Sequence, residues 1–562
     1  MFNALFTKTD EYARLAQALG GPGACALFGI PGSGRAMVYA ALAKALGKPL
    51  CIVTPGEAEA TRFAGDLNAL GVAAAVFPAR DYVLRPIEGT GREYEYRRLA
   101  VLGDLVGGRL QAVCVPDEGL TQYTTPRADF CANTRSLHPG DTLPRAELTA
   151  LLYGAGYTRR DQVDGPGQFS IRGDIADIYA PDMKQPARME FWGDEIDTMH
   201  TFDLATQRRD EPIEKIYVSP AREILFGQPA DAAEKIRSYI KKARGRRRTA
   251  LETCTAADLA QLDGGVMPVN MDKYLTLRYP EPATILDYFD DPLLILEEPA
   301  SLREAERATA FRRGEELSAL LEDGVLAAGL DKLYAESGWL WAQCAAHRTL
   351  CAENFARSMP DVPLKTIVNA PAHTLPAWGG EVAALLEDIQ PLCSGGTAVT
   401  VMAGTPRAAA GLAADLRTKG LNVTTDAAAE PSAGLVQILP GQLSAGCSLP
   451  FAKYAMFTAR AFGVSGAQKK KKRNKDALNS LSEISVGDLV VHQNHGIGRY
   501  AGIQRMAVQG VTKDYLRIEY DKKDVLYVPV TQLDLLSRYT APGDSDNVKL
   551  SRLGGSDWAK TR

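Results

Sequence analysis

The stretch ACALFGIPGSGRA, residues 24–36, joins a short apolar run to a glycine-rich loop. An apolar run of this length bounded by turn residues is typical of a buried strand, and residues 35–46 have the amphipathic pattern of a helix. Further buried strands are expected at 50–54, 73–77 and 111–115. Strands that alternate with helices predict a parallel sheet with helices on both faces.

The loop has the spacing of a P-loop, G-x-x-x-x-G-K-[ST], and the expected position between a strand and a helix. Its glycines are present: Gly29, Gly32 and Gly34. Arg35, however, replaces the lysine that reaches the phosphates, and Ala36 lacks the hydroxyl that binds magnesium. We therefore expect a degenerate P-loop that does not hydrolyse ATP and serves as a structural remnant. Weak phosphate binding by the loop amides stays open, as does a role for Glu297 or Glu298 as the acid of such a site.

Composition excludes several classes of protein. The 562 residues are 46% hydrophobic and 23% charged, which is ordinary for a multidomain globular protein. Lys and Arg number 64 against 68 Asp and Glu, so the chain is not a globally basic nucleic-acid coat protein. No apolar run is long enough for a membrane span. The nine cysteines form no CxxC pair, which argues against a disulfide framework or a zinc site and fits the reducing cytoplasm. We expect no metal site and no catalytic residues.

The order of patterns predicts a multidomain α/β protein. It combines a degenerate P-loop-type parallel sheet, an α+β insert, a second small α/β domain and a C-terminal SH3/Tudor-like β-barrel. The expected divisions are 1–123 and 223–335 for the first domain, 124–222 for the insert, 336–455 for the second domain, 456–483 for a basic linker, 484–545 for the barrel and 546–562 for a connector.

The insert carries a candidate docking patch. In a strand at 169–171, alternation puts Phe169 on one face and Arg172 on the other, so Arg172 is expected to project outward. Arg159 and Tyr179 are candidates to join it, because Arg and Tyr are frequent anchors of protein interfaces. The alternative is an ordinary solvated sheet face.

The C-terminal segment predicts strands at 489–492, 514–520 and 525–530, with a hairpin turn at 521–524. Residues 484–539 hold seven Lys/Arg and six Asp/Glu, which disfavours binding driven by phosphate charge and suits protein contact. Ile503, Met506 and Val508 lie in a candidate edge strand with exposed apolar groups. The alternative is that these three residues face the barrel core.

Two basic runs, 241–248 and 469–475, are the only candidates for nucleic-acid binding in the sequence. A solvated helix face and a flexible linker are the respective alternatives.

Two long motifs carry a resemblance to a known family. Residues 157–207, with RRDQV, GQFSIRGDIADIYAP and RMEFWGDEIDTMHTFDLATQ, resemble the second domain shared by the excision-repair protein UvrB and the bacterial transcription-repair coupling factors (Mfd). The segment GDLVVHQNHGIGRYAGI, followed by YLRIEYDKKDVLYVPVTQLDLLSRY, resembles the RNA-polymerase-interacting domain of that family, which is related to the CarD regulators. The order of the motifs resembles the N-terminal portion of the coupling factors.

The resemblance implies two partners. The insert would bind UvrA, with Arg159 and Arg172 on matching arginine positions; UvrB has another arginine where Ser170 stands here. The barrel would bind the RNA polymerase β subunit. The family's motor, a translocase that uses ATP and magnesium on double-stranded DNA, would follow residue 562, so residues 1–562 themselves are expected to be non-catalytic.

Two other functions compete with this interpretation. A UvrB-like ATP-dependent helicase or damage-binding protein would need a working P-loop and a long aromatic hairpin, but residues 77–105 are short and hold few aromatics. A CarD-like transcription regulator would have no use for the UvrB-like insert.

Overall fold

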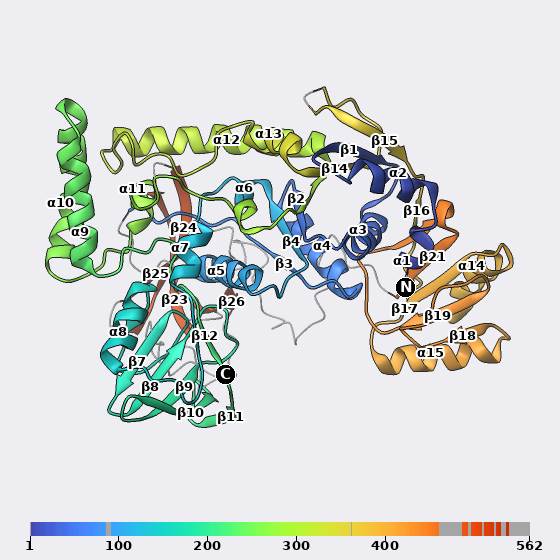
Figure 1. The fold of residues 1–562 in the computed structure, drawn as a ribbon, viewed down its shortest axis with the longest axis horizontal. Coiled ribbons are helices and arrows are strands. Elements are labelled where there is room, and N and C mark those ends of the chain that lie inside the picture. Colours follow the sequence, from blue (N-terminus) through green and yellow to red (C-terminus); the bar gives the residue numbers. More distant parts are fainter. Residues whose placement is uncertain are drawn as a thin grey trace.

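A seven-stranded sheet, parallel throughout, organises residues 23–369 (Figure 1). The computed structural model of the chain describes residues 2–85, 92–360, 362–459, 486–492, 496–508, 511–521, 524–529 and 536–538. In sheet order the strands are β15 (Leu364–Asn369), β1 (Gly23–Phe28), β14 (Arg348–Glu353), β13 (Leu293–Glu297), β2 (Leu50–Thr54), β4 (Ala112–Pro116) and β3 (Ala74–Val76). The parallel sheet expected from the N-terminal pattern is confirmed.

Both faces of this sheet are buried, as the apolar runs predict. Leu50 and Ile52 of β2 join one core cluster, whereas Cys51 and Val53 join the other, because side chains alternate along a strand. The first face is covered by α1 (Asn3–Phe6), α2 (Asp10–Ala18), α3 (Gly32–Leu46) and α4 (Glu57–Ala69). The second face is covered by α5 (Glu93–Val106), α12 (Pro299–Glu322) and α13 (Trp339–Ala346).

The predicted boundary after residue 335 is wrong. β14 and β15 lie on the two sides of β1 and complete the first sheet, so this domain continues to Asn369. The sequence analysis assigned residues 364–369 to the following domain because their alternation resembles the strands that come after them. Only the pairing of β15 with β1, more than 300 residues earlier in the chain, shows that residues 364–369 belong to the first domain and not to the second.

The insert has a sheet and a core of its own. Six strands lie in the order β11 (Arg209–Pro212), β10 (Glu195–Phe202), β9 (Ala187–Trp192), β8 (Ile175–Tyr179), β7 (Gln168–Arg172) and β6 (Thr158–Arg159). Beside them are the pair β5 (Arg135–Leu137) and β12 (Ile216–Val218) and the helices α7 (Arg127–Ala132) and α8 (Arg145–Gly154). Alternate strand residues, among them Phe169, Ile178 and Met189, fill this core.

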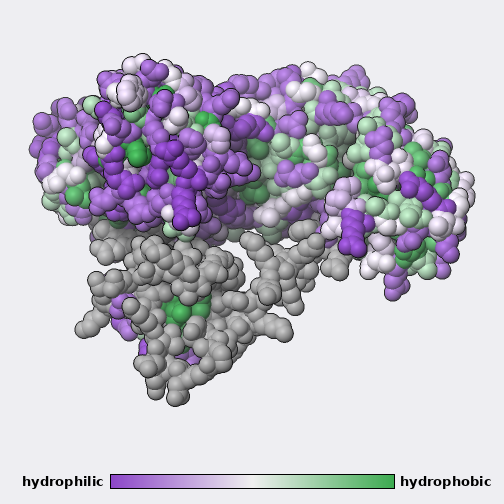
Figure 2. All heavy atoms as spheres, turned by 90° about the horizontal axis from the view of Figure 1, so that it is seen from below, coloured by the Kyte–Doolittle hydropathy of each residue, from purple (hydrophilic) through white to green (hydrophobic). Residues whose placement is uncertain are grey.

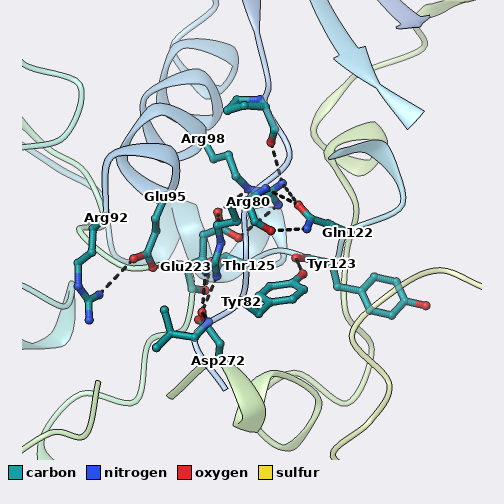
Figure 3. A network of polar contacts seen from close by, with 12 residues as sticks. Arg80, Tyr82, Arg92, Glu95, Arg98, Gln122, Tyr123, Thr125, Glu223 and Asp272 are labelled. Carbon is teal, nitrogen blue, oxygen red and sulfur yellow. Dashed lines mark hydrogen bonds and ion pairs between the residues drawn. The ribbon is translucent and has the colours of Figure 1, made fainter. Parts of the chain in front are cut away.

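A buried polar network lies where the sheet, the insert and the following helices meet (Figure 3). The fully buried Arg98 of α5 donates to both carboxylate oxygens of Glu223, at 2.6 and 3.3 Å. Arg80 donates to both oxygens of Asp272, at 2.7 and 3.0 Å, and its Nε lies 3.3 Å from Glu223. Gln122, just before the insert, accepts from Arg98 at 2.9 Å and donates to the carbonyl of Arg80 at 2.6 Å. The chain therefore enters and leaves the insert at one ion-pair cluster.

A helical region follows the insert and packs on a separate apolar cluster. Its elements are α9 (Pro229–Lys242), α10 (Gly245–Asp263), η1 (Met271–Tyr274) and α11 (Leu275–Arg278). η2 (Ile285–Tyr288) and α6 (Asp117–Leu120) instead pack on the second face of the sheet. α9 ends at Lys242, and α10 packs against it, so the basic run 241–248 spans two helices.

The second α/β domain is joined to the first by a shared core. Its sheet has the order β16 (His373–Leu375), β20 (Gly446–Leu449), β21 (Tyr454–Thr458), β17 (Ala398–Met402), β19 (Leu435–Leu439) and β18 (Asn422–Thr424), with α14 (Val382–Ser394), α15 (Pro406–Thr418) and η3 (Pro450–Ala452). Cys447 and Tyr454 belong to the same buried cluster as α3. Ser444 donates its backbone N–H and its hydroxyl to Asp66 of α4, at 2.7 and 2.6 Å. The second small α/β domain therefore shares part of its core with the first.

The C-terminal segment forms an antiparallel five-stranded sheet. Its order is β25 (Val525–Pro529), β24 (Val511–Glu519), β23 (Gly496–Val508), β22 (Leu489–His492) and β26 (Leu536–Arg538). The hairpin between β24 and β25 matches the predicted turn, and the SH3/Tudor-like barrel stays a prediction. In the described part of the chain, no helix combines the length and apolar character needed to cross a bilayer.

We expect Glu223→Gln to destabilise the protein by about 3–5 kcal/mol, because it leaves Arg98 and Arg80 buried with too little negative charge. Urea unfolding followed by fluorescence measures the loss. The matched control is Glu147→Gln, which removes an exposed carboxylate paired with Arg135 and should cost less than about 1 kcal/mol. Equal midpoints for the two variants would contradict the role given to the network.

Candidate functional sites

Side chains from other parts of the chain pack closely against the glycine loop after β1. Gly29 has φ +89°, a conformation that side chains rarely adopt. A Cβ at Gly32 would lie 2.7 Å from the guanidinium of Arg62, and one at Gly34 would lie 2.6 Å from the Sγ of Cys447. The fold thus requires Gly29 and Gly34 whether or not a phosphate binds, whereas the clash at Gly32 is with the flexible end of the Arg62 side chain and carries less weight.

Arg35 is held by the two acids considered above as partners of a nucleotide site. It is only 4% exposed, its Nη1 lies 2.7 Å from Glu298, and its Nη2 lies 3.1 Å from Glu297. The hydroxyl of Tyr39 also donates to Glu297. Burial alone would lower the pKa of Arg35, but the carboxylate of Glu297 raises it above its ordinary value, so the arginine stays charged. Burial in turn raises the pKa of Glu297, and Arg35 opposes that effect.

The arrangement does not fit a magnesium nucleotide. The cation that would reach a phosphate is engaged by carboxylates, and the fully buried Ala36 offers no oxygen to a metal. Glu298 also adopts φ +49°, an uncommon conformation for a residue other than glycine, at the start of α12. The structural-remnant interpretation of the loop and weak phosphate binding by its amides both stay predictions.

We expect Arg35→Ala to lower stability by about 3–5 kcal/mol, because Glu297 would be buried without its cation. Without Arg35, the folded-state pKa of Glu297 should rise further above its unfolded value. Stability should then be lost increasingly as pH rises from about 5 to about 8. Thermal unfolding at both pH values measures the effect. The control is Lys48→Ala, which breaks the exposed pair with Asp291 and should leave the stability almost unchanged at both pH values. A loss of stability in Arg35→Ala that does not depend on pH would contradict the account.

The outer face of the insert holds an ordered arginine. Arg172, at the end of β7, has a side chain 52% exposed, and its Nη2 donates to Asp177 at 3.0 Å. Asp177 is buried and also accepts two bonds from Arg188 of β9, at 2.6 and 2.9 Å. Tyr179 lies two residues beyond Asp177 on the same face, half-buried, and its hydroxyl donates to the carbonyl of Lys184 at 3.3 Å. Asp177 therefore fixes the orientation of Arg172 while most of its guanidinium remains available.

Arg159 lies at the same edge of the sheet but belongs to its opposite face. It pairs with Phe169 across β6 and β7, and Phe169 and Arg172 are on opposite faces of β7. Its exposed guanidinium nevertheless lies 3.4 Å from the carbonyl of Ile171, next to Arg172 in the chain. Ser170 is buried and donates to the carbonyl of Asp161 at 2.9 Å, so it adds no exposed group here.

Trp192 is a residue that the sequence analysis missed. It ends β9 with its side chain 83% exposed, on the face that also carries Arg188 and Glu190. The pairing of Glu190 with Ile175, and of Ile175 with Arg172, makes this the face of the ordered arginine. The signal was present in the pattern ARMEFW, whose alternation turns Trp192 outward. Around it, the end of the molecule with the insert has a mainly hydrophilic surface (Figure 2).

The backbone of β23 carries the three residues predicted to bind polymerase. Ile503 pairs with Leu516, which is buried, whereas Met506 pairs with Lys513 and Val508 with Val511. The side chains of the predicted trio lie outside the described residues. In the described pairings, the segment from Gly502 to Val508 pairs with β24 on one side. The residues of β23 that pair with β22 are the earlier ones, Gly496 to Arg499.

Comparisons with known proteins match both motifs. Residues 136–224 match the family model of the UvrB interaction domain, and residues 484–540 match that of the CarD-like/TRCF RID domain. The chain is 29% identical over 557 residues to the transcription-repair-coupling factor of Bacillus subtilis (strain 168), which covers 95% of this chain and 47% of that protein. Factors of the same name from Staphylococcus haemolyticus (strain JCSC1435) and Staphylococcus aureus (strain MRSA252) are 26% and 25% identical, over 86% of this chain and 42% of each relative.

These matches confirm the resemblance to transcription-repair coupling factors. Both domains occur in one chain, in the order that the motifs indicated, which favours a coupling factor over a UvrB-like helicase or a CarD-like regulator. The chain spans less than half the length of the curated relatives described here.

Proposed function

We propose that this chain is the adaptor portion of a transcription-repair coupling factor, which binds RNA polymerase stalled at a DNA lesion and recruits UvrA for excision repair. The observation that carries the proposal is the presence of both matched domains in one chain. The full-length protein would add an ATP- and magnesium-dependent translocase that acts on double-stranded DNA and releases the polymerase. Its place of action would be the cytoplasm.

The insert would contact UvrA through its outer face. Asp177 orients Arg172, and an oriented guanidinium with free N–H groups suits bidentate pairing with a carboxylate of a partner. Trp192 supplies a large apolar group on the same face, Tyr179 lies on that face toward the other end of β8, and Arg159 reaches the edge of the sheet from β6. An oriented arginine and an exposed tryptophan on one face are the composition expected of an interface hot spot.

We expect Arg172→Ala to weaken UvrA binding at least tenfold, or about 1.4 kcal/mol, because the oriented guanidinium is lost. Surface plasmon resonance with immobilised UvrA measures the affinity. Arg135→Ala is the matched control, since it removes another exposed arginine of the insert, on β5. Equal affinities of the two variants would mean that the docking face has been placed wrongly.

The C-terminal sheet would contact the polymerase β subunit along β23. A strand segment paired on one side offers backbone groups and apolar side chains to a partner strand. The near-neutral charge of this segment suits such a contact better than it suits nucleic acid.

We expect Met506→Asp to weaken binding to the isolated polymerase β lobe by tenfold or more, because a buried carboxylate without a partner is costly at an interface. The control is Val486→Asp, which adds the same charge at an exposed apolar residue of the same segment. A pull-down with purified β lobe compares the two. Binding unchanged by Met506→Asp would remove this part of β23 from the proposed interface.

A further inference from the structure

The turn that joins α9 to α10 concentrates positive charge. Residues 235–251 contain eight Lys or Arg and no Asp or Glu, in a chain whose net charge is -4. The hairpin lies at the end of the molecule opposite α14 and α15 (Figure 1). The sequence analysis noted this basic run, and neither of the two docking functions uses it.

The turn is held on a rigid support. Ile236 and Ile240 of α9 and Leu251 of α10 are buried in the cluster beneath it. Arg247 anchors the hairpin, because its Nε donates to the carbonyl of Ala328 at 3.0 Å and its Nη2 donates to the hydroxyl of Tyr239 at 2.7 Å. Within the turn, Gly245 has a φ of +57°, in the left-handed region that favours glycine.

Four cations of the turn are exposed and lack a carboxylate partner among the residues that the structure describes: Lys241, Lys242, Arg244 and Arg246. Of the neighbouring cations, Arg248 is paired with Glu252 at 2.8 Å and Arg237 with Asp263 at 2.6 Å. Four unpaired cations on a short turn create a strong local positive potential. The positive end of the 19-residue helix α10, which begins at Gly245, adds to it.

The chemistry of the turn suits phosphate groups, and the engagement of its aromatic residue favours a duplex over a single strand. A binder of single strands needs exposed aromatic rings on which bases stack. The aromatic residue of this turn, Tyr239, is instead half-buried and engaged by Arg247. We propose that the turn between α9 and α10 binds the phosphate backbone of double-stranded DNA, independently of base sequence and of the two protein-docking faces.

The test is fluorescence anisotropy of the chain with a labelled duplex of about 30 base pairs, over a series of salt concentrations. Replacing Lys241, Lys242, Arg244 and Arg246 together by Ala should weaken binding at low salt by roughly tenfold or more. The slope of log K against log salt should fall by about 3–4, since each phosphate contact contributes about 0.9. The matched control replaces Lys469, Lys470, Lys471 and Lys472 by Ala, which changes the charge equally at a run outside the described residues. The control should keep the wild-type slope.

Three results would overturn the proposal: a wild-type chain that does not bind the duplex, a turn variant that binds as the wild type does, or a control variant that loses as much. Thermal unfolding should give the same midpoint for all three proteins, because the substituted side chains are exposed. Binding of the turn variant to UvrA and to the polymerase β lobe should be unchanged. A failure of this proposal is thereby distinguishable from a failure of the proposed function.

Discussion

The ion pair between Arg98 and Glu223 is the constraint on which the arrangement of this molecule depends. Both side chains are fully buried, so each is tolerated only because the other, together with Arg80, Asp272 and Gln122, satisfies it. The network joins the helix α5, the two ends of the insert and the helical region. The insert therefore cannot turn freely about its two connections. A docking face on such a support has a fixed orientation, so little of it has to become ordered when a partner binds.

The same chemistry explains the glycine loop. Directly after the glycine loop, Arg35 pairs with Glu297, which is buried, and with Glu298, which is partly exposed. Gly29 remains necessary because of its positive φ, and Gly34 because Cys447 approaches it closely. One loop can thus keep the glycine spacing of a catalytic motif while the arginine next to it pairs α3 with the end of β13 and the start of α12.

The sequence predicts the elements well where the pattern is local. The buried runs expected at 50–54 and 111–115 are strands, and the alternation of GQFSIRGD places Arg172 on the outer face. Long-range pairing has no such pattern, so the boundary after residue 335 was misplaced and the shared core around Cys447 was not foreseen. The buried network could not be predicted from the sequence either, because Arg80, Gln122 and Asp272 are far apart in the chain. Trp192 is different, since its exposure was readable from strand alternation.

The central claim is that one chain holds two partners on separate surfaces. Sedimentation velocity of the chain mixed with purified UvrA and the polymerase β lobe tests it most directly. The account predicts a ternary complex, in which neither partner displaces the other and the affinity for each is unchanged by the other. Competition between UvrA and the β lobe, or binding of neither, would contradict the account.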